Sequence, residues 1–396
     1  MKIAAYEPTT EKHSIGFQYI LQRARDAGYD ITYCDDYPDG GYDLVLISVH
    51  HFRDLHTLYN IKRNNMPRLM GGHILLSNPY PFKHYTDYML IGEGESWIVP
   101  ALKQFEEQGS IDLAGTWHCQ NEPPEPIYEP DCPSNPPKLN IYGDDIDGHA
   151  PNWYIEIARG CPYNCAYCEL GSTAPYRWKP LDVVISEIDM IDSTISKRVA
   201  LLAPDQASHP HYQEIHNYIL SKGYFSMFGS FRLDRVIKSE IEFRQNMTIR
   251  VGVDGLSERL RYAVNKRISD NDILRYFKFM IDQGHVNFKI FQMFGFPNET
   301  LQDLAQWELL VNKISLIPKK HIHIRVKFTP LIPQMKTPLQ DFKAVYRFDI
   351  ANAIAEWHKK YRSIFKGKQI DLEMDGTIMG YKTWKEEARL AKCKHY

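Results

Sequence analysis

Long apolar runs are absent from this chain of 396 residues, in which no eighteen consecutive residues are apolar. A membrane-spanning helix needs about 20 such residues, so the sequence predicts no transmembrane segment. The first residues, Met-Lys-Ile-Ala-Ala-Tyr-Glu-Pro, become polar too soon for a secretory signal. We therefore expect a cytoplasmic protein that has no membrane partner.

An excess of one charge is also missing, since 47 basic and 49 acidic residues leave a net charge of −2. A dedicated nucleic-acid binder usually carries a strong basic field, so this class is disfavoured. Seven cysteines are too few for a disulfide scaffold of this length. The 25 Tyr, 18 Phe and 7 Trp exclude a largely disordered chain, because they supply ample surface to bury.

The order of apolar runs predicts an α/β protein in four parts. Residues 1–105 alternate short apolar runs with helical patterns, which is typical of a doubly wound parallel sheet. Strands are expected there at residues 2–6, 30–34, 43–49, 68–70 and 87–91, and a helix at residues 15–27. Ligands in such sheets lie beyond the carboxyl ends of the strands.

Residues 106–150 are rich in proline and read equally well as a flexible linker or as an ordered connection. Residues 151–335 return to strand–helix alternation, with strands expected at residues 153–158, 199–203, 224–231, 247–253, 287–294 and 321–328. This alternation predicts a partial parallel (β/α)6 barrel. Residues 336–396 follow as an extension with a helix at 341–365 and an aromatic, mildly basic tail. This tail could stack on a nucleotide, but a packing helix explains it better.

A cysteine triplet after the first barrel strand is the strongest signal for chemistry. The run Arg-Gly-Cys-Pro-Tyr-Asn-Cys-Ala-Tyr-Cys places Cys161, Cys165 and Cys168 on one loop. Structural zinc sites usually take four protein ligands, whereas three thiolates leave one iron of a cubane iron–sulfur cluster open. A zinc site completed from elsewhere in the chain remains the alternative, as does an electron-transfer protein without catalysis.

This Cys-x-x-x-Cys-x-aromatic-Cys pattern resembles the signature of radical S-adenosylmethionine (radical SAM) enzymes. The resemblance implies that the three cysteines hold a [4Fe–4S] cluster, whose open iron binds S-adenosylmethionine. Reductive cleavage of this molecule then gives methionine and a 5′-deoxyadenosyl radical, with electrons from an external flavodoxin or ferredoxin. The fold expected from the resemblance is the partial barrel.

Further motifs follow the triplet in the order that the family shows. These motifs resemble the family's positions near the adenine and the methionine groups of S-adenosylmethionine. The resemblance implies that this molecule is bound by Tyr167, Asp205, Arg232, Asp254, Gly295 and Pro297. Asp205 stands in place of a Gly-Gly-Glu motif, and Asp254 replaces a glutamate. An ordinary ion pair at the strand ends would also explain Asp205 and Arg232, and Gly295 and Pro297 could simply initiate a helix.

The amino-terminal part resembles the cobalamin-binding domain of one radical SAM subgroup. The resemblance implies that Ser48, His50, Gly71 and Gly72 line the pocket for the cobalamin tail. His13 lies in Glu-Lys-His-Ser-Ile-Gly, a near-match to a cobalt-ligating motif, although a loop histidine beside a helix start is the simpler interpretation.

The function favoured by this resemblance is cobalamin-dependent methylation of an unactivated carbon. A cobalamin-independent isomerisation, cyclisation or oxidation is the alternative reaction, and a non-catalytic iron–sulfur or zinc protein is the alternative class. A small molecule, a nucleotide or a peptide is compatible as the substrate. The sequence predicts no individual catalytic residue.

Overall fold

The computed structural model describes residues 1–9, 12–140, 151–227, 229–241, 243, 247–317, 320–364 and 370–392. Its contacts divide the chain into two compact units. The first comprises Met1–Glu156, Arg177–Val199 and Arg389–Tyr396, and the second comprises Ile157–Tyr176 and Ala200–Ala388. The four-part division expected from the sequence remains a proposal. None of the helices in the described segments has the length and hydropathy of a membrane span.

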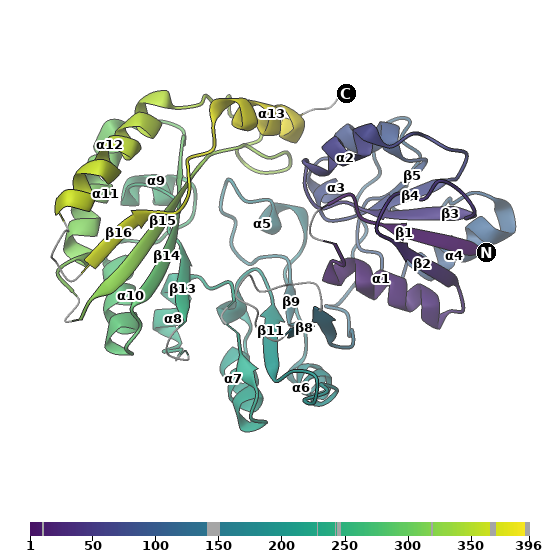
Figure 1. Cartoon of the computed structure of the whole chain (residues 1–396), viewed down its shortest axis with the longest axis horizontal. Coiled ribbons are helices and arrows are strands. Elements are labelled where there is room, and N and C mark those ends of the chain that lie inside the picture. The colour runs from purple at the N-terminus through teal and green to yellow at the C-terminus, as the bar shows by residue number, and fades with distance from the viewer. Residues whose placement is uncertain are drawn as a thin grey trace. The chain divides into compact units, whose positions relative to one another are not determined.

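The first unit contains a six-stranded sheet of order β2-β1-β3-β4-β5-β6 (Figure 1). Its strands are β1 (Lys2–Tyr6), β2 (Asp30–Cys34), β3 (Leu44–Ser48), β4 (Arg68–Gly71), β5 (Tyr88–Leu90) and β6 (Thr116–Trp117). The first five are parallel and β6 is antiparallel. Every residue of β3 is buried, as its unbroken apolar sequence predicts for a central strand.

Helices cover this sheet in the doubly wound manner predicted. They are α1 (Ile15–Asp26), α2 (Asp54–Asn60), α3 (Ile74–Ser77) and α4 (Ile98–Gln108), with a 3-10 helix at Tyr80–Tyr85. The α1 and α4 helices share one apolar cluster with the sheet, which includes Phe17, Leu46 and Leu102. The strand order reverses direction between β1 and β3, where ligands bind in this kind of sheet.

The segment between the predicted domains is ordered wherever it is described. The β6 strand within it joins the first sheet, and the bridge between Gly92 and Ile127 fixes its further course. Next, β7 (Lys138–Asn140) pairs antiparallel with β8 (Asn152–Glu156). The short strands β9 (Ala158–Arg159) and β10 (Arg177–Trp178) pair with each other.

The barrel region forms two four-stranded sheets, and the described strands do not close into a barrel. One sheet has the order β12-β11-β8-β7, with β11 at Arg198–Leu202 and β12 at Phe225–Ser226. The other has the order β13-β14-β15-β16 and is parallel throughout. Its strands are β13 (Thr248–Gly252), β14 (Asn287–Phe294), β15 (Ile322–Pro330) and β16 (Ile370–Met374).

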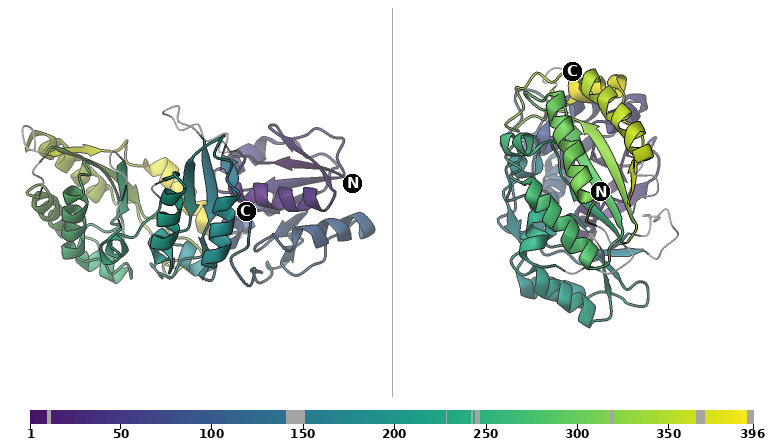
Figure 2. Two further views of the ribbon diagram at one scale, coloured as in Figure 1. Left: turned by 90° about the horizontal axis from the view of Figure 1, so that it is seen from below. Right: turned by 90° about the vertical axis from the view of Figure 1, so that its left-hand side faces the viewer.

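The helices of this region follow the predicted alternation. They are α5 (Leu170–Thr173), α6 (Leu181–Asp189), α7 (Tyr212–Ser221), α8 (Leu233–Lys238), α9 (Glu258–Ala263), α10 (Asp270–Asp282) and α11 (Leu301–Ile314), with a 3-10 helix at Gln206–Ser208. Figures 1 and 2 show α10 and α11 along one side of the sheet from β13 to β16. On that side Phe277 packs on Phe288, and Trp307 packs on Phe328.

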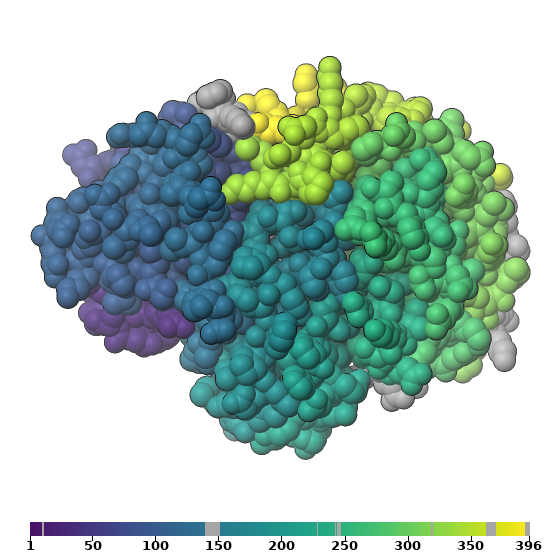
Figure 3. Space-filling view, turned by 180° about the vertical axis from the view of Figure 1, so that it is seen from behind, coloured from purple at the N-terminus to yellow at the C-terminus, as the bar shows by residue number. Residues whose placement is uncertain are grey.

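The carboxy-terminal segment is not only helical. It contains α12 (Phe348–Ile364), β16 and α13 (Tyr381–Lys392), and β16 extends the second sheet beside β15. In the space-filling view the yellow-green residues after β15 lie directly against the green residues before it (Figure 3). The indole of Trp384 donates to the carbonyl of Leu331 at 2.8 Å, and Trp357 packs on Phe328. Trp357, Tyr361 and Trp384 are thus core residues, as the simpler interpretation predicted, whereas Tyr381 is exposed.

Candidate functional site

The cysteine loop lies at the carboxyl end of β9 and is built by close backbone packing. Gly160 has a φ of +66°, and a Cβ there would lie 2.3 Å from the carbonyl oxygen of Pro175, so only glycine fits. The amide of Cys168 donates to the carbonyl of Cys165, and the amide of Ala166 donates to that of Val264. The turn therefore brings all three thiols onto a single loop of the second unit.

The thiols are shielded from water. Cys165 is buried, and Cys161 and Cys168 are half-buried. Burial raises the pKa of Cys161 to about 11 and also raises the pKa of Cys168. A metal that binds these sulfurs would have to displace their protons, as thiolate-bound metals do. Three sulfurs on one loop suit an iron–sulfur cluster that keeps one iron open.

Arg232 and Tyr163 lie beside the cysteine loop. The guanidinium of Arg232 lies 4.3 Å from the centre of the Tyr163 ring, and its Nη1 lies 3.9 Å from the sulfur of Cys165. Its side chain forms an ion pair with Asp234 at 2.8 Å, not with Asp205. The sequence allowed an ordinary ion pair between Arg232 and Asp205. That explanation is wrong, because the two side chains do not pair with each other.

Asp205 instead organises the end of β11. It accepts the backbone amide of Arg232 at 2.9 Å and the hydroxyl of Ser208, while Tyr163 bonds to Ser208 at 2.9 Å. Burial raises the pKa of Asp205, because these hydrogen bonds only partly offset its removal from water. Asp205, Tyr163 and Arg232 thus form one network next to Cys165.

Tyr167 is held by a carboxylate at the end of β13. Its hydroxyl donates to Asp254 at 2.9 Å, and Asp254 also pairs with Lys266. The other side of the Tyr167 ring faces Phe296, with 5.8 Å between the ring centres. Lys266 is buried, and no short motif in the sequence pointed to it. Asp254, its partner, lies in a turn where its backbone φ is positive, at 49°.

The turn after β14 contains Gly295 and Pro297. Gly295 is buried with a φ of +92°, and its amide donates to Glu299, four residues later. Pro297 is half-buried in the same turn. The other carboxylate oxygen of Glu299 is buried without a hydrogen-bond partner among the described residues. Sequence reasoning singled out the turn but not this carboxyl group.

We expect the substitution Glu299→Gln to remove part of the pH dependence of stability. Burial raises the pKa of Glu299 from 4.5 to about 7, so the folded state keeps a proton that the unfolded chain has already released. The resulting stabilisation is complete below about pH 4.5 and is lost as the pH rises through 7, on the order of 3 kcal/mol in all. Urea unfolding from pH 4.5 to 8 should show the wild type losing stability relative to the variant. A difference that stays constant with pH would contradict this assignment.

A separate group of polar residues lies in the first unit, at the switch point between β1 and β3. Glu7, directly after β1, is fully buried and accepts hydrogen bonds from Ser14, Tyr33 and His50. Burial alone would raise the pKa of Glu7, but these three partners bring it below its ordinary value. Sequence reasoning did not single out Glu7.

The four residues that the resemblance implies for the pocket of the cobalamin tail lie at this edge. Ser48 ends β3 and lies 3.2 Å from the imidazole of His50, which in turn lies 3.0 Å from Glu7. Gly71 ends the neighbouring strand β4, and Gly72 follows it. The ring of His73 packs 5.9 Å from that of His50, and burial lowers the pKa of His73 to about 4.

His13 is placed differently from these four residues. Its imidazole stacks on Tyr33 with 4.0 Å between the ring centres, and its backbone has a φ of 60°. Burial lowers the pKa of this imidazole. Glu11 of the predicted cobalt-ligand motif lies outside the described residues. The ring packs against the domain's own Tyr33, and a role of His13 as a cobalt ligand stays a prediction.

We expect the substitution Gly72→Ala to destabilise this edge by at least about 2 kcal/mol. Gly72 has a φ of +131°, and a Cβ there would lie 1.9 Å from the carbonyl oxygen of Val49. Gly71→Ala is the matched control, because nothing lies within 4 Å of its added methyl group. Denaturant unfolding of both variants measures the difference, and equal effects would refute the close approach.

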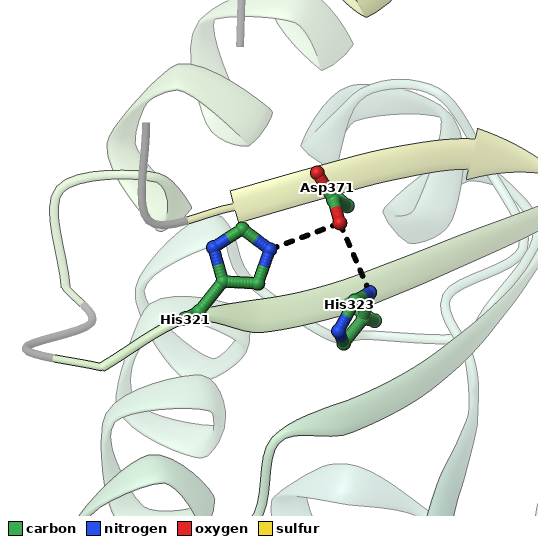
Figure 4. Close-up of side chains that lie close together, drawn as sticks. All are labelled: His321, His323 and Asp371. Carbon is green, nitrogen blue, oxygen red and sulfur yellow. Dashed lines mark hydrogen bonds and ion pairs between the residues drawn. The ribbon is translucent and has the colours of Figure 1, made fainter. Parts of the chain in front are cut away.

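A third cluster offers metal-ligating atoms on β15 and β16. His321, His323 and Asp371 are exposed, and their ligand atoms all lie within 4.8 Å of one another. Asp371 Oδ2 lies 2.9 Å from His321 Nε2 and 3.2 Å from His323 Nδ1 (Figure 4). The hydrogen bond from His321 lowers the pKa of Asp371. Sequence reasoning missed this cluster, because Asp371 is fifty residues away in a strand that it did not predict.

The family model of the radical SAM superfamily matches residues 155–310, which include the cysteine loop and the sheet up to β14. The chain therefore carries a radical SAM domain over these residues. An uncharacterized protein of Methanocaldococcus jannaschii, MJ0966, is 24% identical over 351 residues, which are 84% of this chain and 75% of the relative.

Two solved structures share the fold across both units. The radical SAM methyltransferase TsrM from Kitasatospora setae, with cobalamin and a [4Fe–4S] cluster bound, superimposes with a TM-score of 0.61 at 14% identity, covering 90% of this chain and 76% of TsrM. The cobalamin-dependent radical SAM enzyme OxsB, with aqua-cobalamin bound, gives 0.58 at 12% identity, covering 91% of this chain and 61% of OxsB. The fold is thus that of cobalamin-dependent radical SAM enzymes.

Proposed function

We propose that this protein cleaves S-adenosylmethionine at a [4Fe–4S] cluster held by Cys161, Cys165 and Cys168, and uses the radical to take a hydrogen atom from its substrate. The observation that carries the proposal is a shielded loop with three thiols and no fourth, inside a radical SAM domain. When bound, the cluster supplies the electron that splits the sulfonium of S-adenosylmethionine. That electron would come from a flavodoxin- or ferredoxin-type donor.

The residues around the loop suit the polar groups of S-adenosylmethionine. Arg232 presents a guanidinium next to the sulfur of Cys165 and could pair with the methionine carboxylate. Asp205, buried beside it, is placed to accept a hydrogen bond from the amino group. Tyr167 is fixed by Asp254, which in turn is fixed by Lys266, and this chain would hold the aromatic ring in place for the adenine. Gly295 and Pro297 shape the turn on which Phe296 packs against that ring.

We further propose that the first unit binds cobalamin and that the reaction is methylation of an unactivated carbon. The edge between β1, β3 and β4 suits the polar tail of such a cofactor, because open space lies where a side chain would stand at Gly71. Ser48 and His50 add two polar groups at the switch point. When bound, cobalamin would supply the methyl group. His13 stacks on Tyr33, so we assign no cobalt ligand from this chain.

Binding of cobalamin can be tested apart from turnover. The protein, reconstituted without oxygen, is incubated with hydroxocobalamin and desalted, and retained cofactor is measured from the corrin absorbance and by extraction. His50→Ala should weaken retention about tenfold, the scale seen when one hydrogen bond to a ligand is lost. The adjacent His51→Ala, whose ring is exposed, is the matched control. If the wild type retains no cobalamin, the methylation proposal fails, and the isomerisation, cyclisation and oxidation alternatives remain.

A further inference from the structure

Helices α10, α11 and α12 pack on one face of the sheet of β13 to β16. Along each strand, buried apolar residues alternate with partly or fully exposed ones. The buried residues, such as Phe288 and Phe328, meet α10, α11 and α12 on one side. The other residues therefore point to the opposite face, which is called the open face below.

The open face carries a row of three cations on neighbouring strands. Arg250 on β13 is in register with Lys289 on β14, and Lys289 is in register with Arg325 on β15. A fourth cation, Lys327, lies one step further along β15, opposite Phe291. Like charges directly opposite on neighbouring strands destabilise a sheet. A row with two such like-charged pairs is therefore a cost that the fold tolerates for another reason.

The acidic residues of this face leave most of that charge uncompensated. Asp375 pairs with Lys289 at 2.6 Å, and Asp371 is taken up by His321 and His323 (Figure 4). Of the acidic residues on β16, Glu373 alone has no such partner among the described residues. Arg250, Arg325 and Lys327 form no hydrogen bond or ion pair with any residue in the described segments. Four cations thus share this face with two carboxylates, Asp375 beside Lys289 and Glu373 opposite Arg325 in the register.

The open face leads directly to the candidate site of the same unit. At the next position along β13, a Cβ on Gly252 would lie 3.1 Å from the carboxylate of Asp254 and 3.3 Å from the ammonium of Lys266. Asp254 holds Tyr167, which is adjacent to Cys168. Next to the cations, the ring of Phe291 is 37% exposed and lies 5.3 Å from the Lys289 ammonium. The face therefore combines oxyanion-binding groups with an apolar support.

We propose that the open face binds the substrate, and that the substrate is a small molecule with an oxyanion, either a phosphate or a carboxylate. Arg250, Arg325 and Lys327 pair with the oxyanion, because guanidinium groups match the geometry of both kinds of anion. Phe291 supports an apolar or aromatic portion of the same molecule. This inference extends the proposed function, since it names the substrate class for the radical chemistry of the same domain.

The experiment measures anion binding by the full-length protein, reconstituted without oxygen and kept free of S-adenosylmethionine. Pyrophosphate and tricarballylate serve as the phosphate and carboxylate probes in calorimetric titrations at about 0.15 M salt, which screens loose surface attraction. Arg250→Gln and Arg325→Gln should each weaken binding about tenfold, as expected for one charged hydrogen bond. Both variants should fold, because each removes like-charge repulsion. The probe that binds more tightly identifies the kind of oxyanion.

The matched control is Arg275→Gln, which removes the same charge from the exposed surface of α10. It should leave binding unchanged. Absence of binding by both probes, or an equal loss in the control, overturns the inference. The titration measures no turnover, so its failure concerns only the open face. Failure of the proposed function would look different: the protein would still bind the anion but would form no 5′-deoxyadenosine.

Discussion

Substitution of Cys165 by alanine is expected to abolish both the iron–sulfur cluster and the cleavage of S-adenosylmethionine. Cys165 is buried on the loop that would supply all three ligands, and no described group nearby can replace its sulfur. Loss of a residue that hydrogen-bonds to a metal ligand already lowers metal affinity or activity about 10–100-fold. Loss of a ligand itself should therefore reduce 5′-deoxyadenosine formation by more than about 100-fold. Iron content, visible absorbance and chromatography of 5′-deoxyadenosine measure the effect.

Cys34→Ala is the matched control for that substitution. Cys34 lies in β2 of the other unit, and its sulfur makes only weak contacts at 3.8 Å with the carbonyl of Thr32 and the hydroxyl of Tyr42. It should keep full iron content and full cleavage. Retention of cluster and cleavage in Cys165→Ala would show that the triplet is not the ligand set.

Substitution of Glu187 by alanine should cause the largest loss of stability among single changes in the first unit. Glu187 lies in α6 and binds the ammonium of Lys179 at 2.7 Å, and both side chains are buried. The same carboxylate accepts the hydroxyl of Ser134 and the amide of Asn135. Removing it leaves a buried ammonium without its carboxylate, which costs about 3–5 kcal/mol. Urea unfolding of the purified protein measures the loss.

The exposed pair of Lys103 and Glu107 provides the comparison. These residues lie one turn apart on α4, 3.9 Å from each other, and Glu107→Ala should change the free energy of unfolding by less than about 1 kcal/mol. Replacing both members of the buried pair by Met and Leu should recover most of the loss, because no unpaired charge then remains. A loss below 1 kcal/mol for Glu187→Ala would mean that water reaches Lys179.

The strands were predictable from the sequence where burial imposes a strict pattern. The continuous apolar run of β3 and the alternation in β14 and β15 identified these strands within a few residues. The third strand of the barrel region was expected at residues 224–231, but β12 covers only Phe225–Ser226. The β16 strand also alternates, as Ile-Asp-Leu-Glu-Met, but it lies in a segment where helices and surface charge dominated the interpretation.

Contacts between distant segments explain what the sequence did not reveal. The cysteine triplet is local, so its spacing was enough to predict it. No local motif marks Glu7, Lys266 or Glu299, because each gains its position only when the chain folds. Glu7 is positioned where β1 and β3 meet, Lys266 by its pairing with Asp254, and Glu299 by the turn after β14. Likewise, the cations of the open face lie 36 to 39 positions apart along the chain and align only through strand register.

The central claim is that the cluster leaves one iron free for S-adenosylmethionine. It is tested most directly by electron paramagnetic resonance of the reduced protein, prepared without oxygen, before and after that molecule is added. The account predicts an iron–sulfur signal whose g-values shift on addition, with 5′-deoxyadenosine formed on warming. A protein without iron, or a signal that stays the same with no 5′-deoxyadenosine formed, would contradict it.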